Sequence, residues 1–188
     1  MKTIAHSTLI ALAVAAGVAS GSASAAITGT PSVQATFTTT VTAGTCTAQI
    51  QNAGGQPIST LAFGDVFKSD LVAQSRSEPF KIAFSGCAGV KSATIQATPG
   101  SGGTCTGAAT DGDSFSAGKA TGFEVWKGVA ATGTLLSCNT KPVQTLNISG
   151  ATASMNMAAR IVLGKGQTIA DVTTGDVSAP VTFVVTYQ

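Results

Sequence analysis

Alternation of apolar and polar residues with a period of two constrains the fold of this chain more than any other feature of its sequence. Successive side chains of a β-strand point to opposite faces, so such alternation predicts strands with one buried face. We expect strands at residues 80–84, 91–98, 123–126 and 153–163. Convincing helical periodicity appears nowhere after the first apolar run near the N-terminus. The pattern therefore predicts an all-β fold.

Turn signals separate these runs. They comprise Asn52–Gly55, Pro99–Gly103, Asp111–Asp113 and Gly164–Gly166, and Gly, Asn, Asp and Pro are the residue types that tight turns favour. Short strands at this spacing predict a β-sandwich with immunoglobulin-like layering. On pattern alone, a β-barrel is the main alternative.

The longest clean alternation stands at the C-terminal end of the sequence. Its apolar members are Val177, Ala179, Val181, Phe183, Val185 and Tyr187. A sandwich strand here needs a neighbour on each side, because otherwise it presents an open edge. No further strand follows in the sequence to supply that neighbour.

The first 25 residues have the features of a secretory signal peptide. Lys2 supplies positive charge, Leu9–Ala19 form a short apolar run, and Ala23-Ser24-Ala25 fits the small-x-small cleavage rule. The run is well under the roughly 20 residues of a bilayer-spanning helix, so an N-terminal anchor is the weaker alternative. We expect a mature chain that begins near Ala26, is exported and does not insert directly into a membrane.

Four cysteines follow the predicted signal: Cys46, Cys87, Cys105 and Cys138. None belongs to a Cys-x-x-Cys pair. An even number of cysteines behind a signal peptide indicates disulfides in an oxidising compartment. Sequence permits three connectivities. We favour 46–87 and 105–138, because each pair then flanks a plausible strand region and the two loops do not interlock.

Composition and chemistry exclude several functions. The formal net charge is only +2 and charged residues are 10% of the chain, which does not favour nucleic acid or an anionic membrane as partner. The single histidine, His6, lies in the predicted signal, which removes histidine-dependent nucleophiles and nearly all zinc or copper sites.

Asp111 and Asp113 lack the remaining spacing of a calcium loop. Trp126 is expected to be a packed or half-exposed strand residue rather than part of a sugar site. We expect no cofactor, no metal and no enzyme activity.

The segment from Ala26 to Cys46 is longer than one strand requires. It alternates too, at Ile27, Gly29, Pro31, Val33, Ala35, Phe37, Thr39 and Val41. At about 3.3 Å per residue it exceeds an ordinary strand of a sandwich. It is either a free terminus followed by the first strand, or a strand meant for another molecule.

Taken together, these residues resemble the subunits of chaperone–usher fimbriae, in particular the type 1-like pilins. Phe37-x-x-x-Val41 before Gly44-Thr45-Cys46, and Phe84-Ser-Gly-Cys87 about 40 residues later, resemble the segments that carry their disulfide. Ala159–Val162 resembles their penultimate strand. Gly175, the alternating apolar residues after it and the penultimate Tyr187 resemble their C-terminal signature.

The resemblance implies an incomplete immunoglobulin-like sandwich that lacks its last strand and leaves a groove. A strand from a periplasmic chaperone would fill the groove first, and the N-terminal extension of a neighbouring pilin subunit would replace it. Assembly would involve an outer-membrane usher, and the chain would be exported through the periplasm to a cell-surface fimbrium. The function implied is that of a structural subunit of an adhesive fimbria that polymerises by donor-strand exchange.

The resemblance also assigns segments. Residues 1–25 would be the signal peptide, 26–36 the donor-strand extension and 37–188 the pilin domain. Candidate donor positions are Ile27, Gly29, Pro31 and Val33. Chaperone-recognition and groove-edge positions are Gly175, Val177, Ala179, Val181, Phe183, Val185 and Tyr187. Cys46–Cys87 would be the family disulfide, with Cys105–Cys138 additional to it.

Two departures and two alternatives remain. Thr39 stands where the family often has glycine, and Pro31 would remove one ladder hydrogen bond from a donor strand. One alternative is a fimbrial tip or adaptor subunit with its own receptor-binding activity. The other is a self-complete secreted β-sandwich.

Overall fold

The computed structural model describes residues 35–188, and within them Thr40–Gln188 form one compact unit. The predicted signal peptide and most of the predicted 26–36 extension lie outside the described residues, so both stay predictions.

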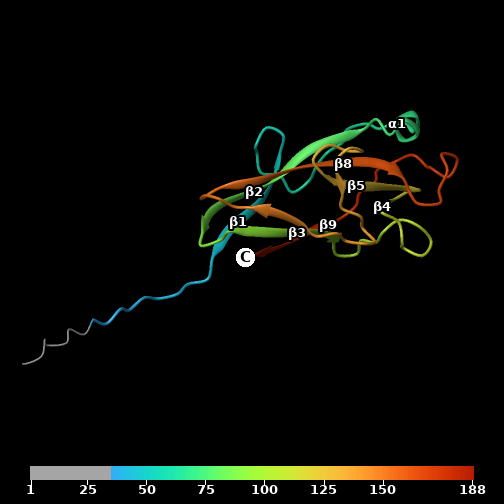
Figure 1. Cartoon of the computed structure of the whole chain (residues 1–188). Coiled ribbons are helices and arrows are strands. Elements are labelled where there is room, and N and C mark those ends of the chain that lie inside the picture. Colours follow the sequence, from blue (N-terminus) through green and yellow to red (C-terminus); the bar gives the residue numbers. More distant parts are fainter. Residues whose placement is uncertain (1–34) are drawn as a thin grey trace, which may run out of the picture. The chain divides into compact units, whose positions relative to one another are not determined.

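Two antiparallel sheets build the compact unit, as Figure 1 shows. The larger sheet has the order β1 (Thr45–Asn52), β2 (Ser77–Ala88), β8 (Ala153–Leu163), β5 (Thr121–Lys127), β4 (Phe115–Gly118), with β6 (Thr134–Leu135) also on β5. The smaller sheet has the order β7 (Gln144–Asn147), β3 (Ser92–Pro99), β9 (Val181–Tyr187). Two separate sheets, each with its own edges, make a sandwich rather than a barrel. The all-β expectation is confirmed.

Alternating residues of the predicted strands form the core between the sheets. On β2, Phe80, Ile82 and Phe84 are buried, and on β3 Ala93, Ile95 and Ala97 are fully buried. From β8, Met155, Met157 and Ala159 join the same cluster. Burying these side chains supplies the main favourable free energy of folding.

A short helix was not predicted. Helix α1 (Lys68–Ala73) buries Leu71 against Ile161 and Val172 in a second, smaller cluster. Its six residues are less than two turns, too few to repeat an apolar position at helical spacing. The helix begins where Asp70 Oδ2 accepts a hydrogen bond from the Phe67 amide at 2.9 Å, and it ends at Gln74, which has φ 51°. No helix within residues 35–188 is long and apolar enough to cross a membrane.

The C-terminal strand is shorter than its alternation. The sequence predicts a strand from Val177, whereas β9 begins at Val181. Pro180 has no amide hydrogen to donate, and its carbonyl accepts from the Gly100 amide at 2.8 Å. The Ser178 amide instead donates to the Ala117 carbonyl at 3.3 Å, which turns this stretch toward β4.

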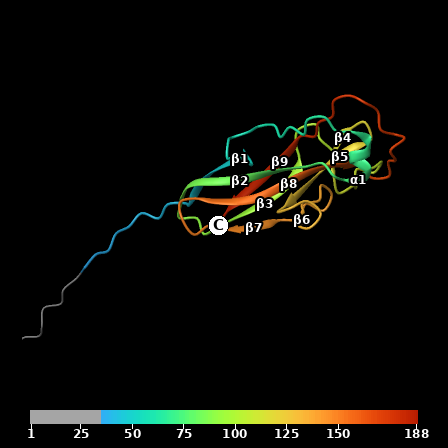
Figure 2. The same ribbon diagram turned by 90° about the horizontal axis from the view of Figure 1, so that it is seen from above.

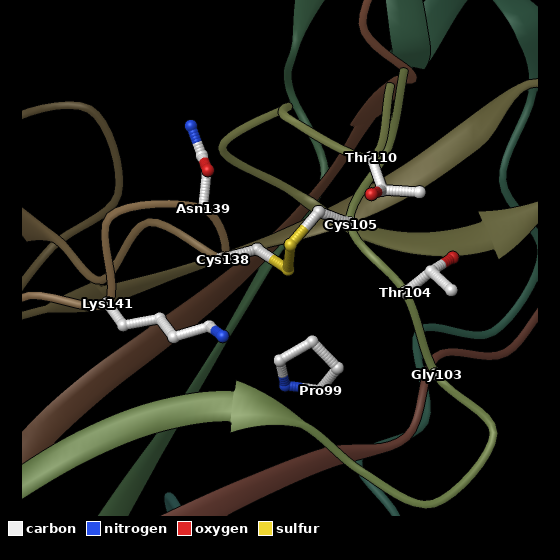
Figure 3. Close-up of a pocket in the computed structure, with 8 residues that line it drawn as sticks. All are labelled: Pro99, Gly103, Thr104, Cys105, Thr110, Cys138, Asn139 and Lys141. Atoms are coloured by element: carbon white, nitrogen blue, oxygen red, sulfur yellow. A yellow bond between two sulfur atoms is a disulfide. The ribbon is translucent and has the colours of Figure 1, made fainter. Parts of the chain in front are cut away.

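Both disulfides follow the favoured pairing. Cys46–Cys87 joins the start of β1 to the end of β2. Cys105–Cys138, drawn in Figure 3, lies within the core cluster. It links the segment before β4 to the segment after β6. Thus one bridge fixes an edge strand to its neighbour and the other fixes two loops to the core.

Candidate functional site at the open edge of the sandwich

Strand β9 is the last strand of the smaller sheet, and its second edge has no strand beside it within residues 35–188. Ser92 and Gln188 exchange both backbone hydrogen bonds, at 3.1 and 2.9 Å. Because backbone groups alternate in direction along a strand, those of the even-numbered β9 residues point to β3. The amides and carbonyls of Val181, Phe183, Val185 and Tyr187 therefore point to the free side. We call these four residues the β9 edge.

The same four side chains face the core but are only half-buried. Three of their four β3 partners, Ala93, Ile95 and Ala97, are 0% exposed. Across the sandwich, the Phe183 ring lies 5.9 Å from Phe80, centroid to centroid, and Tyr187 lies edge-on to Phe84 at 6.3 Å. The core is thus covered at β3 and left open at β9.

Strand β1 forms the corresponding edge of the larger sheet. The Ile50 carbonyl accepts from the Ile58 amide at 3.0 Å, so the backbone groups of Ile50 and of Ala48 point away from β2. Ala48 pairs with Phe84, which is 1% exposed, yet Ala48 itself is exposed. Residues of β1 and β9 come within 8 Å of each other, Cα to Cα, without a backbone hydrogen bond between them in the described chain. The β9 edge and the Ala48 end of β1 therefore flank one apolar surface, while the segment at Ile58 covers β1 at Ile50.

Three predicted edge positions precede β9 rather than belong to it. Ala179 packs half-buried against the main core and Val177 against the second cluster. Gly175 has φ +117°, and a Cβ there would lie 2.6 Å from Lys119 Nζ, which itself donates to the Thr174 carbonyl at 2.7 Å. Only glycine adopts this backbone conformation without strain. Gly175 therefore allows the turn of the backbone that precedes β9.

The predicted donor positions Ile27, Gly29, Pro31 and Val33 lie outside the described residues. Residues 35–44, which follow them, form no strand, and the Phe37 and Val41 side chains are 94% and 92% exposed. The sequence reasoning also missed the contribution of Ala48 and Ile50, although Cys46, Ala48 and Ile50 alternate with Thr47 and Gln49 in β1.

Charge plays little part at the β9 edge, since β9 itself contains no ionisable side chain except the Tyr187 phenol. Groups with displaced pKa values lie elsewhere: the Lys165 ammonium, 2.6 Å from Asp111, holds the pKa of that carboxyl below its ordinary value. No cluster of three metal-ligating side chains occurs in residues 35–188. A hollow of about 250 Å³ beside Cys105–Cys138 includes Lys141 and Asn139 but presents no nucleophile–base pair (Figure 3).

No family model matches the chain. The uncharacterized fimbrial-like protein YadL of Escherichia coli (strain K12) is 41% identical to it over 174 residues, which cover 85% of this chain and 86% of YadL. The chain belongs to the fimbrial-like proteins.

Solved pilus structures share the fold of this chain. The P pilus rod subunit PapA is 19% identical to this fimbrial-like protein, with a TM-score of 0.51 over 70% of this chain and 93% of PapA. A subunit from a chaperone-usher pilus structure that concerns rod uncoiling is also 19% identical, with a TM-score of 0.53 over 84% of this chain and 96% of that one. At such identity the likeness concerns the fold: an incomplete immunoglobulin-like sandwich.

Proposed function

We propose that this fimbrial-like protein is a structural subunit of a surface pilus and polymerises by donor-strand exchange. The open β9 edge carries the proposal. It offers unpaired backbone groups and half-buried apolar side chains along one strand, which is what an added strand requires. The added strand would hydrogen-bond to β9 and place alternate side chains over Phe183 and its neighbours.

The donor would be residues 26–36 of a neighbouring subunit, with Ile27, Gly29, Pro31 and Val33 directed at the core. Before assembly, a periplasmic chaperone would supply a strand to the same edge, and an outer-membrane usher would order the exchange. An exposed strand edge beside apolar surface promotes aggregation, which gives the physical reason for a partner at each stage. The subunit would reach the cell surface through the periplasm and act there mechanically, without catalysis.

A peptide-addition experiment tests this function. A variant that lacks residues 26–36 is prepared, and a peptide of residues 26–36 is added to it. With the peptide at a concentration well above its dissociation constant, the melting temperature should rise by about 10 °C. The reason is that the peptide binds the native state and not the unfolded state. Thermal unfolding followed by circular dichroism measures the change.

The matched control is the same peptide with Gly29→Leu, which adds a bulky side chain where we expect a shallow pocket. It should give a smaller rise. An unchanged melting temperature with the natural peptide, from a variant that is a stable monomer on its own, would favour the self-complete sandwich and refute donor-strand exchange.

A further inference from the structure

A second recess lies at the opposite edge of the smaller sheet from β9. It is a cleft of about 490 Å³ between β7, β8 and the turn that joins β5 to β6. This volume is within the range of small-molecule sites, about 300–1,000 Å³. Figure 2 shows β7 and β6 along one side of the molecule.

Most of the described residues that line the cleft have polar side chains, and none of them has a carboxylate. The residues on which the argument rests are Lys127, Thr145, Asn147, Ser154, Met155 and Asn156. Their hydroxyl and amide groups can donate and accept hydrogen bonds. Met155, 3% exposed, brings the apolar core to the floor. Such a lining suits a ligand with several hydroxyls and an apolar face.

Lys127 is the one cation among the described residues that line the cleft. It is half-buried, and its Nζ lies 3.5 Å from the Thr145 carbonyl oxygen. The ion pairs of residues 35–188 use Arg76, Arg160 and Lys165, so Lys127 has no carboxylate partner there. An ammonium group at the rim of a cleft, without a counter-ion among the described residues, favours an anionic ligand group.

The free edge of β7 adds backbone groups. The backbone groups of Ser92 pair with Gln188, so those of its neighbour Ala93 point to Leu146 on β7. Those of Thr145 and Asn147 consequently point into the cleft. The Thr145 amide and the Asn147 amide and carbonyl can bond to ligand hydroxyls, whereas Lys127 already contacts the Thr145 carbonyl. Backbone groups are held in place by the strand, so binding to them costs less side-chain entropy.

We propose that this cleft binds a sugar acid, a ligand that combines a ring with several hydroxyls and one carboxylate. Lys127 would hold the carboxylate, and the β7 edge with Asn156 would hold the hydroxyls. An extended peptide fits less well, because β7 has only four residues and Lys127 already covers the Thr145 carbonyl. The cleft and the β9 edge lie on opposite sides of β3, so sugar binding is compatible with assembly.

The test is an NMR saturation-transfer titration of the full chain, purified from the periplasm, with three probes: glucuronate, glucose and acetate. We expect saturable binding of glucuronate, and at least about tenfold weaker binding of glucose, which lacks the charge, and of acetate, which lacks the hydroxyls. Lys127→Gln should weaken glucuronate binding about tenfold. Lys68→Gln is the matched control, because Lys68 Nζ also lies 3.5 Å from a backbone carbonyl, that of Ile169, away from the cleft.

A second pair of variants distinguishes loss of binding at the cleft from a general loss of folded protein. Asn156→Asp places a carboxylate at an exposed position of the cleft and should abolish glucuronate binding, whereas Asn139→Asp, at an exposed position outside it, should not. Absence of saturable binding, equal binding of acetate and glucuronate, or equal effects of the cleft and control variants would each overturn the proposal. None of these outcomes bears on strand acceptance at β9.

Discussion

Arg160 on β8 contacts Glu124 and Trp126 of the neighbouring strand β5. Glu124 Oε2 accepts from Arg160 Nε at 2.9 Å, from Arg160 Nη2 at 2.7 Å and from Trp126 Nε1 at 3.1 Å. The guanidinium also lies 5.4 Å from the centroid of the Trp126 ring. Arg160 stands between Ala159 of the main core and Ile161 of the second cluster, and it is itself only 8% exposed. Trp126 is thus a packed residue that covers the ion pair.

Removing the cation should destabilise the fold strongly. Arg160→Met leaves the Glu124 carboxylate, whose side chain is 16% exposed, without its partner, and we expect a loss on the order of 3 kcal/mol in the free energy of unfolding. Urea denaturation measures it. The double variant with Glu124→Gln should recover part of the loss. Lys165→Met, which breaks an exposed pair, should have a much smaller effect.

Three surface aspartates make stability depend on pH in the acid range. The pKa of Asp111 is lowered by the Lys165 ammonium, that of Asp171 by the Thr168 hydroxyl, and that of Asp70 by the Phe67 amide. A pKa lower in the folded than in the unfolded state gives stability that is present above the ordinary value of 3.8 and is lost as pH falls below it.

The expected result is a urea midpoint that is constant from about pH 7 to pH 5 and falls below about pH 4. Asp171→Ala should lower the midpoint at neutral pH and reduce its drop in acid. A variant whose acid drop equals that of the wild type would contradict the assigned role of Asp171.

At the scale of elements, β9 has two unlike edges. Its even-numbered residues hydrogen-bond to β3, whereas its odd-numbered residues present free backbone groups. The local alternation of side chains says nothing of this difference, because the edge that remains free depends on which strands lie next to β9. Its place at the end of the order β7-β3-β9 decides it.

A pair of proline variants separates the two edges. Val184→Pro removes an amide that faces Gln96 on β3 and should cost about 1–3 kcal/mol more than Val185→Pro, whose lost amide faces the free side. Val185→Pro should retain the fold and weaken binding of the 26–36 peptide. Urea denaturation checks the difference in stability between the two variants, and the peptide titration checks the loss of binding by Val185→Pro. Equal destabilisation by both variants would contradict the assigned directions.

At the scale of the whole molecule, the two disulfides act on the unfolded chain. Cys46 and Cys87 are 41 residues apart, and Cys105 and Cys138 are 33 apart. In the chain-entropy model, closing either loop contributes about 4 kcal/mol. For one domain this is a large part of the net stability.

Replacing Cys46 and Cys87 together by alanine should therefore lower the free energy of unfolding by about 4 kcal/mol and free the start of β1. Denaturation measured with the peptide bound checks the value, and hydrogen exchange at Gln49, whose amide faces Ala83 on β2, checks the loosening of β1. Replacing Cys105 and Cys138 should cost a similar amount without loosening β1. If both pairs of substitutions loosened β1 equally, the local role of Cys46–Cys87 would be refuted.

The sequence by itself determined the long strands. The alternating residues of β2, β3 and β8 predict their buried faces, because a strand that buries one face must repeat with period two. The same rule identified Val181, Phe183, Val185 and Tyr187, and the spacing of cysteines favoured the pairing that the structure has.

Only the tertiary structure decided the rest. Short elements such as β6, β7 and α1 exist because neighbours pair with them or bury a single residue such as Leu71, and so few residues carry no period. Strand pairing in the C-terminal alternation begins only after Pro180, at Val181. Arg160 is buried because Glu124 on the neighbouring strand binds its guanidinium. The open edge is likewise a property of strand order: local patterns specify which side chains turn inward, whereas packing specifies which of them are left half covered.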